Sequence, residues 1–187
     1  MAGVESNKES AYYAEHVLDL FAEIMHDAIT VEPLRQVGSD ITPALAQGLQ
    51  FILRHGVCSV RDIAQGMSMT YSAASQLTDR LVKKGLATRS ENERDRRLSE
   101  IRLTDQGVDL VERIRRERIG RIAAMLGKMS PDRGRILVET LEEFIAAAIG
   151  DGRSALKTCA HCGKDHIAEC IVNEVYRAAT GMQIQRT

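Results

Sequence analysis

Apolar residues recur at helical spacing along most of the chain, so the sequence predicts a mainly α-helical protein. One such stripe covers residues 13–29 and is expected to end near Pro33. Another helix is expected to start at Thr42-Pro43, where a hydroxyl cap precedes a ring whose missing N–H costs nothing. Two long stripes cover residues 108–129 and 131–148. The length of 187 residues suits one domain, or one domain with a small appendage.

Between residues 59 and 85 the pattern is typical of two short helices joined by a turn. Ser59 and Asp62 have the spacing of a capping box, with Asp in place of the usual Glu or Gln. The second helix is expected to begin at Thr70 and to stop at Gly85. In DNA-binding proteins, the second helix of such a pair lies in the major groove.

After Gly85 the apolar pattern changes to the period of a β-strand. Residues 86–89 and 98–103 predict two short strands, and the segment between them is polar and mostly charged. A hairpin with an arginine-rich tip can reach the DNA backbone or the minor groove. The sequence thus predicts a winged helix-turn-helix with a small β-hairpin wing, followed by a long helix that starts at Thr104.

Positive charge is concentrated in the predicted DNA-contacting helix and wing. The whole chain has a net charge of −1, but basic residues outnumber acidic ones between Arg80 and Arg102. A solvated charged face is the alternative interpretation. The predicted DNA-contacting side chains are short or cationic and suit base edges and phosphates: Tyr71, Ser72, Ser75, Gln76, Arg80 and Lys83 on the helix, and Arg94, Asp95, Arg96 and Arg97 on the wing.

Residues from about 41 to 148 resemble the MarR family of winged-helix transcription regulators. The resemblance is carried by residues 59–64 and 75–86, by Asp95-Arg96-Arg97, and by residues 103–107. It implies an obligate homodimer with interleaved N- and C-terminal helices, and a recognition helix at residues 70–84 that binds duplex DNA. It further implies that Asp95 orients Arg97, which enters the minor groove. A surface ion pair worth under about 1 kcal/mol is the alternative for Asp95 and Arg97.

The resemblance sets the expected domain organisation. A dimerisation helix is expected in residues 1–40, the winged helix in 41–107, further dimerisation helices in 108–150 and a separate tail in 151–187. In this family small acidic or phenolic ligands often bind between the dimerisation helices and the DNA-reading part. A small-molecule effector in the dimer cleft is therefore an expectation, although no residue here identifies it.

Other function classes are less consistent with the sequence. No Ser–His–Asp set, phosphate-binding glycine loop or pair of carboxylates stands out, so we expect no enzyme. No segment comes near the roughly 18 to 20 consecutive apolar residues that cross a bilayer, and the first ten residues are polar. We therefore expect a cytoplasmic protein without membrane contact.

Four soft metal ligands stand close together in the tail: Cys159, Cys162, His166 and Cys170. Cys159 and Cys162 are expected to form a tight knuckle with Gly163 in its turn, and His166 and Cys170 to share one face of a helix. Three thiolates and one imidazole complete a tetrahedral zinc shell, which indicates a structural or sensory site.

Other interpretations of the tail remain open. The same cysteines can hold an iron–sulfur cluster, or can be unliganded or redox-active thiols. His161 competes with His166 as the nitrogen ligand. Cys58 stands apart and is expected to be a small buried residue, with an oxidation sensor as the alternative.

The function of the tail has two readings as well. Its apolar residues after Cys170 need a partner surface, and we expect this surface on the dimerisation helices. A metal that folds the tail is therefore expected to gate DNA binding. Alternatively, the tail is a metal-organised protein-interaction module and DNA binding is vestigial.

Overall fold

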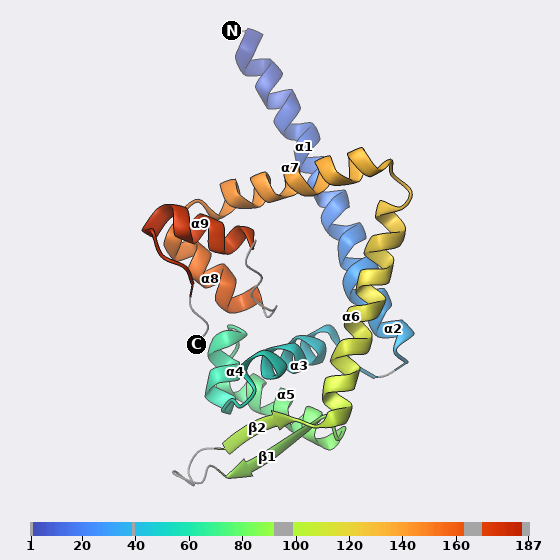
Figure 1. Cartoon of the computed structure of the whole chain (residues 1–187), viewed down its shortest axis with the longest axis vertical. Coiled ribbons are helices and arrows are strands. Elements are labelled where there is room, and N and C mark those ends of the chain that lie inside the picture. The colour runs from blue at the N-terminus through green and yellow to red at the C-terminus, as the bar shows by residue number, and fades with distance from the viewer. Residues whose placement is uncertain (1, 39, 92–98, 163–169, 185–187) are drawn as a thin grey trace.

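A computed structural model describes residues 2–38, 40–91, 99–162 and 170–184. Within these ranges the chain is mainly helical, with one two-stranded antiparallel sheet (Figure 1). The elements in chain order are α1 (Ala2–His26), the π-helix η1 (Asp27–Val31), α2 (Glu32–Gln36), α3 (Pro43–His55), α4 (Val60–Gly66), α5 (Tyr71–Lys83), β1 (Ala87–Glu91), β2 (Ser99–Leu103), α6 (Asp105–Leu126), α7 (Pro131–Ile149), α8 (Gly152–Cys162) and α9 (Ile171–Thr180).

Hydroxyl side chains fix the starts of the central helices, as the sequence predicts. The side chains of Thr42, Thr70 and Thr104 each accept a hydrogen bond from the backbone N–H three residues further on. Ser59 and Asp62 form a complete capping box at the start of α4. These bonds satisfy N–H groups that a helix cannot pair internally, so the boundaries of α3 to α6 are set locally.

The N-terminal helix continues further than the sequence predicts. Helices α1, η1 and α2 follow one another without a break up to Gln36, and Pro33 lies near the start of α2. Proline has no N–H, so the carbonyl of Ile29 lacks its usual α-helical donor. The Arg118 Nε of α6 donates to that carbonyl over 2.9 Å. The expected stop at Pro33 is therefore wrong, because a π-helical turn and an arginine from another helix accommodate the proline.

The main core lies where α3, α4, α5 and the hairpin meet. Leu49, Ile52, Ile63, Leu81 and Ile101 are fully buried there. The first half of α6 closes one side of this core with Leu110 and Ile114. Burial of apolar area at about 25 cal/mol per Å² drives this packing, so the winged helix has a substantial core of its own.

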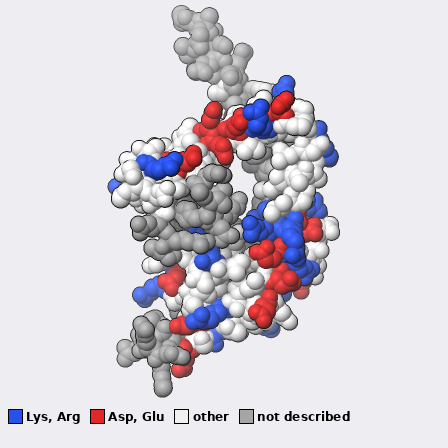
Figure 2. All heavy atoms as spheres, viewed as in Figure 1, with Lys and Arg blue, Asp and Glu red and all other residues white. Residues whose placement is uncertain are grey.

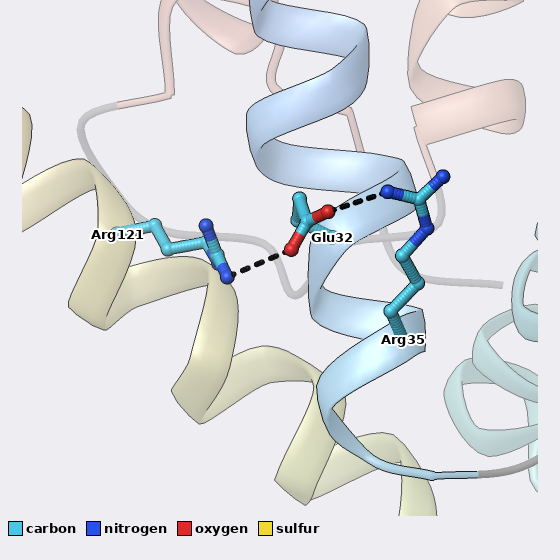
Figure 3. Close-up of polar contacts among 3 residues, drawn as sticks. All are labelled: Glu32, Arg35 and Arg121. Carbon is cyan, nitrogen blue, oxygen red and sulfur yellow. Dashed lines mark hydrogen bonds and ion pairs between the residues drawn. The ribbon is translucent and has the colours of Figure 1, made fainter.

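Polar contacts hold α6 against α2. The two carboxylate oxygens of Glu32 accept separate bonds, one from Arg121 of α6 at 3.2 Å and one from Arg35 of α2 at 2.7 Å (Figure 3). Nearer the start of α6, Arg113 donates to the carbonyl of Val37 over 3.1 Å. The N-terminal helices and α6 therefore form one connected unit.

The tail is a pair of packed helices attached to the end of α7. In Figure 1 α7 crosses away from α6, and α8 and α9 lie together near α3 and α4. Only Gly150 and Asp151 separate α7 from α8, which begins at Gly152. Ala155, Cys159 and Val172 form a small second core, with Ile149 of α7 packed against it. The apolar stripe of α9 thus finds its partner surface on α8 and on the last turn of α7.

Across the described residues, we find no helix with both the length and the apolar character required to span a bilayer.

Candidate nucleic-acid interface

Helix α5 presents a polar face outward and is anchored by its opposite face. Ala74, Leu77, Thr78 and Leu81 are buried, and the Thr78 hydroxyl donates to the Ala74 carbonyl over 2.7 Å. The predicted DNA-contacting residues lie on the opposite side. Ser75 is half-buried, and the others are exposed: Tyr71, Ser72, Gln76, Arg80 and Lys83.

Close packing against α3 fixes the position of α5. A Cβ on Gly48 of α3 would come within 2.7 Å of the Leu77 Cδ2 atom of α5. A larger residue at position 48 would require the Leu77 side chain to shift, so glycine favours the close approach of α3 and α5. The polar face of α5 is therefore displayed by a rigid support, as the recognition helix of a helix-turn-helix requires.

The hairpin is a regular antiparallel pair that is tied to α5 at its base. Ala87 pairs with Leu103 at one end, and Glu91 pairs with Ser99 at the other. Arg89 of β1 donates to the Asp79 carboxylate of α5 over 2.8 Å. This ion pair links β1 of the wing to the recognition helix.

The predicted wing residues Arg94, Asp95, Arg96 and Arg97 lie outside the described residues. Their expected contact with a groove therefore stays a prediction. The described cations nearest to them along the chain are on the recognition helix and at the wing base: Arg80, Lys83, Lys84, Arg89 and Arg102. Elsewhere in the view of Figure 2, basic and acidic side chains are interspersed, in keeping with the net charge of −1.

Cys58 is part of the support for the wing. It forms an isolated bridge to β2: its N–H donates to the Ile101 carbonyl at 3.2 Å, and its carbonyl accepts from the Ile101 N–H at 2.8 Å. Burial, with a smaller contribution from the charge of Asp62, raises the pKa of the Cys58 thiol to about 12. A thiol that stays protonated is a poor redox sensor. The prediction of a small buried residue is therefore confirmed.

The tail cysteines lie at the same end of the α8–α9 pair. Cys159 is buried in the last turn of α8, the exposed Cys162 is its last residue, and Cys170 directly precedes α9. Cys170 packs, half-buried, against the small core that contains Cys159. His166 lies outside the described residues. Among the residues that are described, no three His, Cys, Asp or Glu side chains are grouped closely enough to hold a metal ion.

Two local predictions for the tail are wrong. Cys159 and Cys162 lie in the continuous helix α8 and not in a tight knuckle. Cys170 has extended backbone angles (φ −70°, ψ 120°) and caps α9, so it cannot share a face of that helix with His166. Good helix formers at residues 155–157 favour the start of α8, which then continues to Cys162. Separately, α9 begins only after Cys170.

Two contacts of this region were not predicted from the sequence. The first is the Asp79–Arg89 pair at the wing base. The second joins the tail to the winged helix: Arg54 at the end of α3 donates to the backbone carbonyl of Cys159 over 3.0 Å. The two partners are separated by 105 positions, and no local pattern signals such a pairing.

A hollow of about 510 Å³ lies open on the tail helix α8, beside Ser154, Lys157, Thr158 and Cys162, outside the dimerisation and DNA-reading regions where an effector is expected. An open hollow of about 160 Å³ lies beside Arg35, between Val31, Leu34 and Ile41. Ligand pockets typically enclose about 300–1,000 Å³, so this hollow gives no support to a bound effector.

Comparison with known proteins identifies the architecture. The model of the MarR family matches residues 39–98. The structure resembles the crystal structure of RV1404 from Mycobacterium tuberculosis with a TM-score of 0.62 and 28% identity, over 72% of this chain and 93% of that one. It also resembles YusO of Bacillus subtilis with a TM-score of 0.66 and 24% identity, over 75% of this chain and 97% of that one. The chain has the MarR winged-helix fold.

Curated MarR-type sequences match a smaller part of the chain. The transcriptional repressor MdtR of Bacillus subtilis is 39% identical over 67 residues, which is 36% of this chain and 43% of that protein. The transcriptional regulator YwhA of the same organism is 30% identical over 84 residues, which is 45% of this chain and 60% of that protein. The chain thus covers about half of each relative. A MepR variant of S. aureus with a TM-score of 0.59 and 22% identity, over 72% of this chain and 97% of that one, was solved bound to an oligodeoxyribonucleotide.

These comparisons bear on the fold class and on the tail. The predicted fold class, mainly helical with a winged helix and a two-stranded hairpin, is confirmed. The MarR model ends at residue 98, so it does not cover the cysteines of the tail.

Proposed function

We propose that this protein is a transcription regulator that binds duplex DNA as a homodimer. Helix α5 enters the major groove, and the wing contacts the adjacent backbone or minor groove. The observation that carries this proposal is the exposed face of α5, where hydrogen-bonding and cationic side chains are held by a tightly packed opposite face. The MarR fold and the relatives named as transcriptional regulators support the same conclusion.

Exposed apolar faces on α1 and α7 support the homodimer. Phe21 and Ile24 of α1 and Phe144 and Ile145 of α7 are all exposed in the single chain, Phe144 by 53%. Large contiguous apolar patches on a soluble protein mark surfaces that pair with another surface. A second copy of this chain is the proposed occupant, because both faces lie outside the DNA-binding core and belong to the regions expected to dimerise.

Light scattering after size-exclusion chromatography tests the dimer. Phe144→Asp places a charge in the proposed interface and is expected to yield monomers at micromolar concentration. Glu142→Lys changes an exposed charge on the same helix and should leave the dimer intact. A monomeric wild-type protein contradicts the proposed assembly.

Binding to a duplex selected from a random-sequence library tests the DNA interface. Arg80→Ala and Arg97→Ala are each expected to weaken binding and to make the slope of log affinity against log salt shallower by about one. Lys128→Ala removes a charge from the exposed turn between α6 and α7, and it should leave affinity and slope unchanged. If neither arginine variant changes binding, DNA binding by this surface is refuted and the interaction-module alternative is favoured.

We further propose that the tail holds a zinc ion through Cys159, Cys162, Cys170 and His166. The support is the spacing of the four ligands along the chain and the position of the three cysteines near one end of the α8–α9 pair, where they are not yet grouped closely enough to hold a metal ion. Thiolates are preferred ligands of zinc, and a closed set of four protein ligands would make the site structural or sensory.

Elemental analysis and an absorption spectrum of anaerobically purified protein test the metal site. About one zinc per chain without visible colour is expected. Iron with labile sulfide and a broad visible band would instead indicate an iron–sulfur cluster. Protein that binds neither metal contradicts the site, and that result leaves the DNA-binding proposal untouched.

A further inference from the structure

The tail is connected to the rest of the chain at two separate places. At the first, α8 follows α7 after only Gly150 and Asp151, and α9 packs back on α7, where Ile149 adjoins the small core of the tail. At the second, Arg54 in the last turn of α3 donates through Nη1 to the backbone carbonyl of Cys159 over 3.0 Å. The α8–α9 pair (residues 152–180) therefore runs from α7 back to the winged helix (Figure 1).

The contact at α3 has the chemistry of a helix C-terminus that meets a cation. Cys159 lies in the last turn of α8, and the last four carbonyls of a helix have no partner within that helix. The negative end of the helix dipole also favours a guanidinium at this position. The Nη2 atom of Arg54 lies 3.8 Å from the Cys159 sulfur, which is a weak additional acceptor. Cys159 is buried and Arg54 is half-buried, so water only partly screens the contact.

The α8–α9 pair is packed closely enough to move as one body. Ala155 is fully buried in the small core between the two helices. A Cβ on Gly152 would come within 3.0 Å of the Thr180 Cγ2 atom, so the start of α8 lies close to the end of α9. The buried Asn173 side chain accepts from the Ile184 N–H over 2.9 Å and holds the chain that follows α9. Close packing transmits a restraint applied at α3 through this pair to α7.

The tail adds a second connection between α7 and the winged helix. The first connection is α6, which the exposed turn at residues 127–130 separates from α7. Turns and helix ends are the places where one part of a fold rotates relative to another. In Figure 1 the tail lies on the left and α6 on the right, so the two connections reach the winged helix at different points. Two connections at separate points restrict a rotation that either one alone permits.

We propose that the α8–α9 pair is an intramolecular strap that holds the winged helix in one orientation relative to α7, and that Arg54 is the positioning residue that attaches it. The strap reduces the range of orientations that the free protein samples. Less conformational freedom is then lost when α5 binds DNA, which increases affinity. This effect on DNA rests on the proposed function, whereas the restraint itself does not.

Hydrogen exchange measured by mass spectrometry on the full-length protein tests the restraint. In Arg54→Ala, exchange in the last turns of α3 and α8 is expected to be several-fold faster than in the wild type, because local opening no longer breaks the contact. Exchange in α5 should be unchanged, since the main core holds its buried face. Arg153→Ala removes an exposed positive charge from α8 and is the matched control, which should exchange like the wild type.

DNA affinity as a function of salt tests the consequence for binding. Arg54→Ala is expected to bind a selected duplex several-fold more weakly than the wild type, with an unchanged slope of log affinity against log salt. The slope stays the same because Arg54 contacts the tail and not a phosphate. A slope that becomes shallower by about one would make Arg54 a phosphate contact and would overturn the strap.

A second variant breaks the strap without changing the winged helix. Val172→Asp places a charge in the small core of the tail, which is separate from the main core. It should speed exchange at the end of α3 and weaken DNA binding by the same factor as Arg54→Ala. The double variant should bind no more weakly than either single variant, because both changes release the same restraint. Val172→Asp also provides the test if Arg54→Ala does not fold.

The remaining outcomes separate the strap from the proposal on which its effect rests. Unchanged exchange at the ends of α3 and α8 in Arg54→Ala overturns the strap. Tighter DNA binding by Arg54→Ala, or additive losses in the double variant, overturns its role in preparing the winged helix for DNA. A wild-type protein that binds no duplex refutes the proposed function, and the exchange measurement then decides the strap by itself.

Discussion

Gly107 lies directly against the backbone of Leu86, so closely that a Cβ on residue 107 would overlap the Leu86 carbonyl oxygen. Gly107 belongs to the first turn of α6, and Leu86 follows the recognition helix. Thr104 spans the same junction: its hydroxyl accepts from the Gly107 N–H at 3.1 Å and donates to the Gly85 carbonyl at 2.7 Å. The end of α5 and the start of α6 are therefore joined by a closely packed contact.

Substitution of Gly107 by alanine is expected to destabilise the fold. The added methyl group meets a backbone carbonyl that cannot move aside as a flexible side chain can, and such overpacking typically costs about 1–3 kcal/mol. Urea unfolding at a fixed protein concentration measures the effect. Gly120 is the matched control, because it lies on the same helix with open space around its Cβ position. Gly120→Ala should be neutral or stabilising by up to about 1 kcal/mol, because alanine favours helix. Equal effects of the two variants would contradict the close contact at Gly107.

The Asp79–Arg89 ion pair is expected to matter for DNA binding more than for stability. Both side chains are partly exposed, so Asp79→Ala should reduce the free energy of unfolding by less than about 1 kcal/mol. The same variant should lower DNA affinity several-fold, because the wing base is no longer held against α5. Fluorescence anisotropy with a labelled duplex measures this loss. Glu100→Gln breaks an ion pair within β2 and serves as the control. A large stability loss without an affinity change would assign Asp79 a folding role only.

Arg118 is expected to stabilise the N-terminal helices through the carbonyl that Pro33 leaves without a partner. Burial lowers the pKa of Arg118, although the guanidinium stays charged. Arg118→Ala should cost about 1.5–3 kcal/mol, the usual value for a hydrogen bond from a charged donor. Pro33→Ala restores an N–H at residue 33, so the loss should be smaller when both changes are combined. A double-mutant cycle by urea unfolding measures this coupling, and strict additivity would refute it.

Cys58 is expected to resist alkylation in the folded protein. With the pKa of its thiol raised to about 12, almost none is thiolate at pH 8. Iodoacetamide followed by mass spectrometry should label the exposed Cys162 of metal-free protein first, and Cys58 only after denaturation. Comparable labelling rates in the native state would contradict the burial of Cys58.

The same pKa shift predicts the effect of alkaline pH on stability. The thiol has a pKa of 9.0 when unperturbed and a higher one when folded. Its contribution to stability is therefore fully present below pH 9, and it is lost as the pH rises toward 12. The stability advantage of the wild type over Cys58→Ala should shrink across this range. An advantage that stays constant up to pH 10.5 in urea titrations would contradict the shift.

Features encoded within a few residues could be predicted from the sequence. The helix starts at Thr42, Ser59, Thr70 and Thr104 depend on bonds to residues three positions away, so the local sequence contains the whole signal. The exposed face of α5 follows from the position of its apolar residues, because a helix that buries Leu77 and Leu81 must expose the opposite side.

Features that depend on distant partners could not be predicted. The helix continues through Pro33 because Arg118, from another helix, bonds to Ile29. The contact of Arg54 with Cys159 joins segments 105 positions apart. Within the tail, the spacing of the cysteines led to a predicted knuckle and a shared helix face that the structure does not form. Spacing alone did not reveal that Cys170 precedes its helix.

Because α5 and α6 are closely packed at their junction, a tilt of α6 moves α5 with it. At about 1.5 Å per residue, this helix is about 33 Å long, so a tilt of about 10° about its far end displaces α5 by about 6 Å. In a two-fold symmetric dimer, both recognition helices move by this amount, in opposite directions. Half-sites on DNA are spaced by about 34 Å for one helical turn, so such a displacement is enough to bring the two helices into or out of register with them. Under the proposed function, a tilt of α6 at its distant end would therefore change which operator spacing the dimer can occupy.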